Sequence, residues 1–368
     1  MKEIGDMMGA VWGNNIKLSI FGESHGKGIG INIDGIEPGF KIDFEEIKYY
    51  MNKRRPGTSN ITTARKEKDE AQILSGIFEG VTTGAPICVF IPNEDKKSKD
   101  YSILKEVMRP GHSDYPAYVK YHGYNDVRGG GHFSGRLTAP LVYAGSIARE
   151  ILKEKGINIY SHIKSIKNID DIRFEKADID LIRETQKKEF QVLDDSVEKD
   201  MREEILKAKK MGNSVGGTIE CMAIGVPAGI GNPFFDSLES TISHLMFSIP
   251  AVKGIEFGKG FDITRMYGSE ANDKYFYCND KVEAKSNNNG GILGGISNGM
   301  PLNITVGIKP TPSIGIKQHS INVSKKENCE LQIEGRHDPC IVPRAVVVVE
   351  SVMALAILDQ LKGAGLNG

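Results

Sequence analysis

The sequence has few cysteines and no pattern that would give them a shared role. Its five cysteines are widely spaced and none forms a Cys-x-x-Cys pair, which argues against a disulfide framework and a zinc-ribbon type of metal site. The longest apolar stretch, residues 345–358, is interrupted by Glu350 and is too short to cross a bilayer. The first eight residues are too polar for a signal peptide. We therefore expect a cytoplasmic protein with no metal site and no membrane partner.

An excess of basic residues is also missing. Lys and Arg total 47 against 48 Asp and Glu, a formal net charge of −1. Aromatic residues make up 7% of the chain, too few to suggest nucleic-acid bases stacking along a basic stripe. We therefore expect no nucleic acid and no anionic membrane surface as a partner. The hydrophobic content of 39% is typical of a folded soluble protein.

Glycine, in contrast, is abundant. The chain has 42 glycines among 368 residues, well above the usual level of roughly 7%, and they lack the every-third-residue period of collagen. Many of them gather with proline in loops between periodic segments. These loops cover residues 22–35, 54–60, 109–114, 128–140, 287–301, 309–315 and 335–344. The main question that the composition raises is what these glycines do.

The periodic segments predict a mixture of strands and helices. Strands are expected at 17–22, 29–33, 85–91, 157–166, 218–226 and 302–308, and helices at 43–54, 141–155, 198–210, 236–248 and 343–362. Asp43 and Asp236, each followed three residues later by Glu, predict helix N-caps. The elements do not alternate strictly, which favours an α+β fold over a doubly wound sheet. We expect one domain over residues 1–368, with the charged stretch 164–212 as a surface elaboration.

The arginines indicate where anions could bind. Eight of the 13 arginines lie in or beside the glycine-rich loops, whereas the 34 lysines crowd the amphipathic stretches. A planar guanidinium suits bidentate binding of carboxylate and phosphate, and glycine exposes backbone N–H groups to the same anion. The eight are Arg54, Arg55, Arg65, Arg109, Arg128, Arg136, Arg336 and Arg344. Any one of them could instead bridge surface carboxylates, but eight together favour an anion site.

Three histidines in the same loops suggest acid–base chemistry. His25 lies in the run GESHG after the first strand, His112 in RPGHSD and His337 in GRHDPC. An imidazole on a rigid turn is a good general acid near neutral pH, and a neighbouring arginine would bring an anionic substrate to it. A structural role remains the alternative for each histidine taken alone. A metal site at His337 and its neighbours lacks a second cluster of ligands.

Familiar nucleophile and nucleotide motifs are missing. GESHG places Ser24 beside His25 rather than between two glycines at the spacing of a serine-hydrolase nucleophile elbow. The glycine clusters at 128–136 and 287–299 fit neither the Rossmann nor the P-loop pattern. The residues therefore predict an enzyme with several phosphate or carboxylate groups in its site and histidine acid–base chemistry. They do not name the reaction.

Taken together, the motifs resemble those of chorismate synthases over nearly the whole chain, from Trp12 to near Leu361. The matching text includes FGESHG, KRRPGTSN, EGVTTGAPI, RPGHSDY, RGGG, NNNGGILGGISNG, KPTPSI and GRHDPC. The resemblance implies a β-α-β sandwich, usually assembled as a homotetramer. It implies a 1,4-anti elimination that turns 5-enolpyruvylshikimate 3-phosphate into chorismate and phosphate, the last step of the shikimate pathway to aromatic amino acids. Such enzymes need reduced FMN without net redox change, and NADPH is a candidate reductant.

The resemblance also implies roles for individual residues. His25 would donate a proton to the reduced flavin, His112 would be the acid toward the departing phosphate, and Asp338 would assist deprotonation at flavin N5. Ser24 and Ser134 would support proton relay. Substrate anions would be bound by Arg54, Arg109, Arg136 and Arg336. The flavin would be bound by His132, Phe133, Ser134, Pro250, Ala251, Gly294, Lys309, Pro310, Thr311, Pro312, Ser313 and Arg336.

Just after the triple glycine, this sequence differs from the one more common in the family. His132, Phe133 and Leu137 stand where Arg, Ser and Glu are more usual, whereas Ser134 and Arg136 match. Because these two match, we expect the activity to be kept. Two other classes are alternatives: a flavin oxidoreductase with net hydride transfer, and a non-catalytic anion- or RNA-binding protein. The balanced charge argues against the second.

Overall fold

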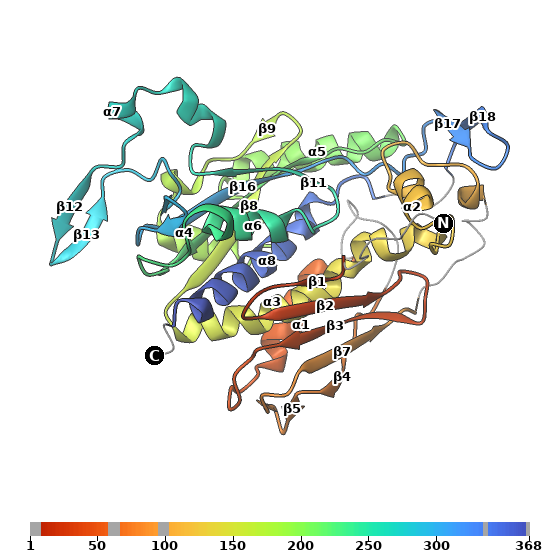
Figure 1. Cartoon of the computed structure of the whole chain (residues 1–368). Coiled ribbons are helices and arrows are strands. Elements are labelled where there is room, and N and C mark those ends of the chain that lie inside the picture. Colours follow the sequence, from red (N-terminus) through yellow and green to blue (C-terminus); the bar gives the residue numbers. More distant parts are fainter. Residues whose placement is uncertain (1–8, 58–66, 95–102, 334–337, 366–368) are drawn as a thin grey trace.

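The computed structural model describes residues 9–57, 67–94, 103–333 and 338–365. Within them, two five-stranded antiparallel sheets lie on either side of a group of helices (Figure 1). The structure therefore has the predicted α+β class. That residues 1–368 form one domain, and that residues 164–212 are an elaboration on it, stay predictions.

The first sheet contains the N-terminal strands. Its order is β1 (Val11–Trp12), β2 (Lys17–Gly22), β3 (Gly28–Asp34), β7 (Ile87–Pro92) and β4 (Gln72–Ser75). Alternate residues of β7, from Ile87 through Val89 to Ile91, are fully buried. This period of two is expected of a strand with one face on the core. β2 has the bounds that the sequence predicts, and the GESHG turn follows it directly.

The second sheet contains strands from later in the sequence, from residue 158 onward. Its order is β11 (Val252–Phe257), β16 (Leu302–Ile308), β10 (Gly217–Ile224), β8 (Asn158–Ile166) and β9 (Ile169–Asp170). β8, β10 and β16 are close to the predicted strands, whereas β11 was not predicted. β16 delivers the chain into the Lys309–Ser313 loop, which is one wall of the site described below.

The helices between the sheets are α1 (Phe44–Arg54), α3 (Thr138–Glu154), α6 (Leu238–Met246) and α8 (Val342–Gly363). α3 packs against β3 and β7 of the first sheet, α8 packs against β8 and β10 of the second, and α3 and α8 pack against each other. Gly145 allows this close crossing, because a Cβ there would lie 2.3 Å from the Cβ of Ser351. The layer is therefore held together mainly by α3 and α8.

The apolar run 345–358 lies in α8, and nearly all of its side chains are buried in the core. Glu350 interrupts the run for a structural reason: its carboxylate lies 2.5 Å from Arg149 and accepts a hydrogen bond from the Ser161 hydroxyl. The ion pair and the hydrogen bond offset the cost of removing this carboxylate from water. In the part of the chain that is described, no helix is both long and apolar enough to cross a membrane.

The two predicted helix caps have different outcomes. Asp43 caps α1, where its side chain accepts the backbone N–H groups of Glu45 and Glu46. Asp236 does not cap α6; it ends a short 3₁₀ turn, η6 (Phe234–Asp236), and Ser237 accepts the N–H of Ser240 instead. The prediction was wrong by one residue because Ser237, itself a good N-cap residue, takes the extended conformation that precedes the helix.

The remaining elements are short or peripheral. The 3₁₀ turns are η2 (Ile103–Lys105), η3 (Arg128–Phe133), η4 (Gly135–Leu137), η5 (Phe174–Lys176) and η7 (Gly260–Arg265). The further helices are α2 (Asp114–Lys120), α4 (Ile179–Thr185), α5 (Asp195–Lys210) and α7 (Gly268–Ala271). The hairpins pair β5 (Ile77–Phe78) with β6 (Val81–Thr82), β12 (Tyr275–Cys278) with β13 (Lys281–Ala284), β14 (Ile292–Leu293) with β15 (Ile296–Ser297), and β17 (Gln318–Asn322) with β18 (Glu327–Leu331).

Candidate active site

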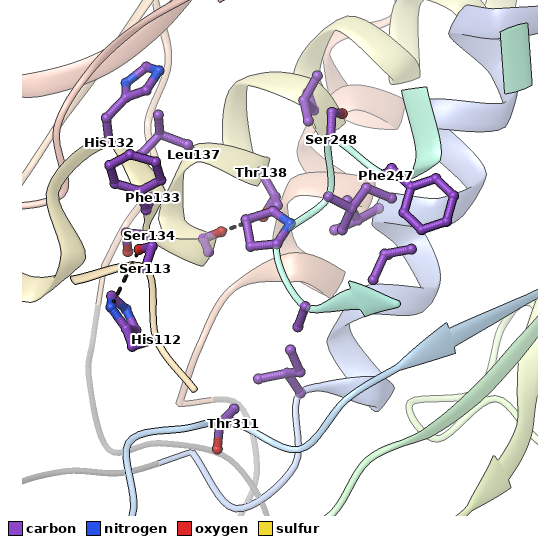
Figure 2. A pocket seen from close by; sticks show the side chains of 18 of the residues that line it. His112, Ser113, His132, Phe133, Ser134, Leu137, Thr138, Phe247, Ser248 and Thr311 are labelled. Atoms are coloured by element: carbon purple, nitrogen blue, oxygen red, sulfur yellow. Dashed lines mark hydrogen bonds between the residues drawn. The ribbon is translucent and has the colours of Figure 1, made fainter. Parts of the chain in front are cut away.

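A cavity of about 1140 Å³ lies where the helix layer meets the glycine-rich loops. Its apolar walls come from β2, α3, α8 and the segment around Leu245–Val252, and its polar walls come from the loops at 109–113, 129–135 and 309–313. Figure 2 shows side chains from these loops facing one another across it. Pockets for one small ligand usually measure roughly 300–1,000 Å³, so the cavity has room for more than one ligand.

Most of the predicted site residues line this cavity, although they come from segments far apart in the sequence. They are His25, Arg54, Arg109, His112, His132, Phe133, Ser134, Pro250, Ala251, Lys309, Thr311, Pro312, Ser313 and Asp338. Ser24, Arg136, Gly294 and Pro310 do not line it. Arg336 lies outside the described residues, as does His337. The loops that the composition singled out therefore converge on one site.

His25 is held at the edge of the cavity by the turn that follows β2. The Ser24 hydroxyl lies 3.0 Å from His25 Nδ1 and is itself fully buried. Asn93 donates hydrogen bonds to the backbone oxygens of Glu23 and Gly26, which fixes the turn from the neighbouring strand end. Ser24 therefore orients the imidazole from behind, and His25 is the member of this pair that faces the cavity.

The triple glycine of η3 packs against both histidines of the cavity. Gly129, Gly130 and Gly131 all have positive φ angles, of 58°, 89° and 53°, a conformation that glycine adopts without steric cost. A Cβ on Gly129 would lie 2.2 Å from His25 Cε1, and one on Gly130 would lie 3.3 Å from His112 Nε2. These glycines thus make room for two imidazoles, a role that the sequence pattern did not distinguish from a phosphate cradle.

His112 belongs to a tight turn that Asp114 closes. The carboxylate of Asp114 lies 2.6 Å from His112 Nδ1 and accepts hydrogen bonds from Arg109 Nε at 2.7 Å and from the other end of the same guanidinium at 2.8 Å. The remaining guanidinium nitrogen of Arg109 donates to the Ser313 hydroxyl. Arg109 lines the cavity as predicted, but its donors bind the protein itself, and its position supports an organising role.

The electrostatics of this turn favour a neutral imidazole beside a charged carboxylate. Burial lowers the pKa of His112, and the positive charges of Arg109 and Lys309 lower it further, while Asp114 works in the opposite direction. Burial acts to raise the pKa of Asp114, but the hydrogen bonds from Arg109 and His112 outweigh it and hold that pKa well below its usual range. Asp114 is therefore ionised whenever the protein is folded near neutral pH.

Arg54 is the buried cation that faces the cavity. One guanidinium nitrogen lies 2.6 Å from Asp69, and burial lowers the pKa of Arg54 to about 10 although Asp69 opposes this. Its Nε has no hydrogen-bond partner among the described residues. A buried guanidinium with an unused donor at a cavity wall suits an anionic ligand group.

Arg136 lies behind that wall rather than in the cavity. Its side chain is bonded to Asp69 at 2.7 Å, to the Asn93 side chain and to the backbone oxygen of Pro92. Asp69 thus bridges Arg136 and Arg54. All three guanidinium nitrogens of Arg136 are bonded to the protein, and Arg136 holds Asp69, which in turn holds Arg54. Substrate binding by Arg136 stays a prediction.

Asp338 also lines the cavity and pairs with Arg344 of α8 at 2.7 Å. Its backbone oxygen accepts a hydrogen bond from the Thr311 hydroxyl, which ties the start of α8 to the loop after β16. Lys309 in the same loop donates to the backbone oxygen of Gly111 and so links this wall to the His112 turn.

The walls suit a flat, partly apolar and anionic cofactor. Ala251 has a φ angle of 76°, which is uncommon for a residue with a Cβ and marks a backbone held in place by its surroundings. Its carbonyl accepts the N–H of Lys309, so the Pro250–Ala251 segment and the loop after β16 form one continuous wall. Phe133 supplies an aromatic side chain in a second wall, and Lys253 and Lys309 supply cations. Gly294 lies in the β14–β15 hairpin, away from the cavity lining.

Sequence reasoning assigned no individual role to three groups that shape the site. Arg344 and Thr138 line the cavity, and Asp114 holds His112. Arg344 had a signal, since it is one of the arginines beside the glycine-rich loops, and Asp114 stands two residues after His112 in the same motif. Among the described residues, no group of three or more His, Cys, Asp or Glu is placed to hold a metal ion.

Comparison with known proteins supports this reading of the loops. The family model described as chorismate synthase matches residues 16–361. A chorismate synthase of Pyrococcus abyssi is 46% identical over 349 residues, which cover 95% of this chain and 96% of the relative. One of Methanobrevibacter smithii is 44% identical over 354 residues, covering 96% of each. A crystal structure of chorismate synthase superposes with a TM-score of 0.76 at 28% identity and covers 97% of this chain and 94% of that one.

Proposed function

Because this chain belongs to the chorismate synthase family, we propose that it converts 5-enolpyruvylshikimate 3-phosphate into chorismate and inorganic phosphate. The reaction is a 1,4-anti elimination, in which one hydrogen and the phosphate leave the substrate with no net redox change. The observation that carries the proposal is the cavity: it places two histidines, a buried arginine and an Asp–Arg pair around a space large enough for a substrate and a cofactor.

The cations of the cavity suit the charges of this substrate, which carries a phosphate and two carboxylates. Arg54 contributes a buried guanidinium to the wall, and Lys309 lines the cavity from the loop after β16. Arg344 is partly neutralised by Asp338. Fixed cations in a site shielded from water bind anions strongly and need no reorganisation during the reaction. We assign Arg54 to substrate binding, and Arg136 to holding it through Asp69.

His112 is placed to act as the acid toward the departing phosphate. Its Nδ1 is engaged by Asp114, while its Nε2 lies beside Gly130 at the cavity. Ser134 also lines the cavity and lies near Gly130, since a Cβ on Gly130 would lie 3.9 Å from the Ser134 Cβ and 3.3 Å from His112 Nε2. A proton on Nε2 would therefore be available to a phosphate oxygen, with Ser134 as a neighbouring hydroxyl for relay.

Reduced FMN, when bound, supplies electron density that assists phosphate departure and a nitrogen that receives the hydrogen lost by the substrate. The residues that would hold it are Phe133, the Pro250–Ala251 segment and the loop from Lys309 to Ser313. His25 would hold a proton at the cavity edge with Ser24 orienting its ring. Asp338 would hold or accept a proton at the cavity wall, where it pairs with Arg344. Gly294 and Arg336 remain predicted flavin contacts.

Several finer properties rest on family membership. We propose that the two sheets and the helix layer are the β-α-β sandwich of the family, that the chain assembles as a homotetramer and that it works in the cytoplasm with NADPH as a candidate flavin reductant. The contacts of α3 with the first sheet and of α8 with the second support the layer order.

The test is an anaerobic incubation of the enzyme with reduced FMN and 5-enolpyruvylshikimate 3-phosphate. We expect chorismate and phosphate in equal amounts, with the flavin still reduced at the end. Stoichiometric oxidation of the flavin would instead support an oxidoreductase. Absence of both products would overturn the proposed function.

A further inference from the structure

The turn that carries His112 contains a carboxylate to which no role in the reaction has been given above. Asp114 begins α2, and its side chain turns back across the loop to His112 and Arg109. It accepts the backbone N–H of Arg109 as well as two guanidinium bonds. Its side chain is 9% exposed. A carboxylate that is this firmly held can fix the orientation of the ring that it contacts.

The 2.6 Å contact determines where the imidazole proton lies. Asp114 is ionised, so its oxygen can accept a hydrogen bond and cannot donate one. A carboxylate oxygen 2.6 Å from His112 Nδ1 favours a proton on Nδ1, because an unprotonated nitrogen would face that oxygen with its lone pair. The Arg109 guanidinium at 3.2 Å and the Ser113 hydroxyl at 3.4 Å also reach Nδ1, and the guanidinium, which has no acceptor, could donate to this nitrogen only if it were unprotonated. The contact with Asp114 is the shortest of the three and involves a full negative charge, so we take it as the one that sets the tautomer. The neutral ring thus keeps Nε2 unprotonated, and Nε2 takes up a proton only when the ring becomes charged.

We propose that Asp114 is the positioning residue of His112: its carboxylate fixes the neutral tautomer and turns Nε2 toward the cavity, where that nitrogen meets the departing phosphate. Gly130 is the complementary feature, because it leaves space beside Nε2. The charged groups around the ring are Asp114 and Arg109 from its own turn and Lys309 from the loop after β16. Asp114 is the one negative charge among these three, and it stabilises the protonated ring that an acid must become.

The kinetic consequence of this inference rests on the proposed function, whereas the tautomer of His112 does not depend on it. The first test is the ¹⁵N spectrum of the ring nitrogens in the ligand-free wild-type protein, assigned by comparison with His112→Gln. We expect the neutral ring to carry its proton on Nδ1. A proton on Nε2 would overturn the inference, and this measurement needs neither a variant that folds nor an active enzyme.

The second test removes the charge while keeping the shape. In Asp114→Asn the pKa of His112 measured by the same spectra should fall by about 1 unit or more, as expected when a contacting opposite charge is lost. Asp236→Asn, which removes an exposed carboxylate that does not line the cavity, is the matched control and should leave that pKa unchanged. An unchanged pKa in Asp114→Asn would contradict the inference.

The third test is kinetic. The pH above which kcat/KM for chorismate formation declines should move down by the same amount in Asp114→Asn, and Asp114→Glu, which keeps the charge, should restore part of it. A uniform loss of activity with an unshifted profile would reduce Asp114 to a structural role. If the wild-type enzyme makes no chorismate, the proposed function fails while the spectra still decide the tautomer.

Discussion

Among the described residues, two histidines contact carboxylates, and they differ in which ring nitrogen the contact leaves available. His112 has one carboxylate partner, on Nδ1, and presents Nε2 to the cavity. His162 of β8 is fully buried in the second sheet region, with Asp171 2.9 Å from Nδ1 and Glu220 2.9 Å from Nε2. A single carboxylate partner leaves the second ring nitrogen of His112 for proton transfer. Two carboxylate partners occupy both ring nitrogens of His162, which gives that residue a structural role.

The electrostatics of the two rings differ in the same sense. Burial lowers the pKa of His112, and Asp114 only partly compensates. Burial also acts to lower the pKa of His162, but the hydrogen bonds to Asp171 and Glu220 outweigh it and raise that pKa. The ring of His162 is therefore held charged, and that of His112 can change its charge. In this pair of histidines, the number of carboxylate partners decides whether one ring nitrogen is left without an ion-pair partner.

The largest expected effect is on catalysis. His112→Ala should reduce kcat by roughly 10²- to 10⁴-fold, the span usual for a general acid, because it removes the group proposed to protonate the departing phosphate. The measurement is steady-state phosphate release under anaerobic conditions, with the thermal midpoint as the control for folding. A wild-type rate would remove His112 from the mechanism.

The second effect is on stability. His162→Gln leaves Asp171 and Glu220 buried without the positive charge between them, and breaking a buried ion pair in this way typically costs about 3–5 kcal/mol. Urea unfolding, followed by circular dichroism, measures the loss. Turnover per folded molecule should stay at the wild-type value, since His162 does not line the cavity. An unchanged free energy of unfolding would show that the contacts of His162 with Asp171 and Glu220 do not stabilise the fold.

A third, smaller effect tests the glycines that make room for the cavity histidines. Gly129→Ala would place a Cβ 2.2 Å from His25 Cε1 at a φ angle of 58°, a conformation that costs about 1–3 kcal/mol. The displaced ring should lower turnover by about 10²-fold. Gly268→Ala is the matched control, because its Cβ would meet nothing within 4 Å and its φ is not positive. Equal effects of the two substitutions would rule out the packing role.

The smallest effect is a pH dependence of opposite sign for the two histidines. The pKa of His162 is raised on folding, so its stabilisation is complete below the unfolded value of about 6.5 and is lost as pH rises through the folded pKa. The pKa of His112 is lowered, so its contribution is present above about 6.5 and is lost as pH falls through the folded pKa. Each pKa unit of difference is worth about 1.4 kcal/mol. The measurement is the unfolding free energy of His162→Gln and of His112→Ala from pH 5 to pH 9, each compared with wild type. The difference from wild type should shrink with rising pH for His162→Gln and with falling pH for His112→Ala. Parallel curves for the two variants would contradict the contrast.

Much of the fold could be predicted because its central elements carry strong local patterns. β2 and β16 have the bounds that their β-branched runs and flanking glycines or prolines predict, and α1 begins after the Asp43 cap. The β17–β18 hairpin could not be found this way, because its strands QHSIN and ENCEL are mostly polar and lack a buried face. Its pairing is set by backbone hydrogen bonds, which leave little trace in the sequence.

The sequence predicted which loops form the site but not how their side chains are arranged around it. Histidines and arginines in glycine-rich text pointed to the cavity, and His25, His112 and Arg54 line it. The sequence could not show that Arg136 lies behind the wall, because that depends on Asp69 and Asn93, which come from distant segments. Nor could it show that Asp114 reaches back to His112, since that depends on the geometry of the turn.

The most direct test of the contrast is one anaerobic assay of His112→Ala and His162→Gln at equal concentrations of folded protein, with reduced FMN and 5-enolpyruvylshikimate 3-phosphate. We predict that His162→Gln forms chorismate at the wild-type rate per folded molecule, while His112→Ala falls by roughly 10²- to 10⁴-fold. Wild-type chorismate formation by His112→Ala, or a matching loss in folded His162→Gln, would contradict the division between a catalytic and a structural histidine.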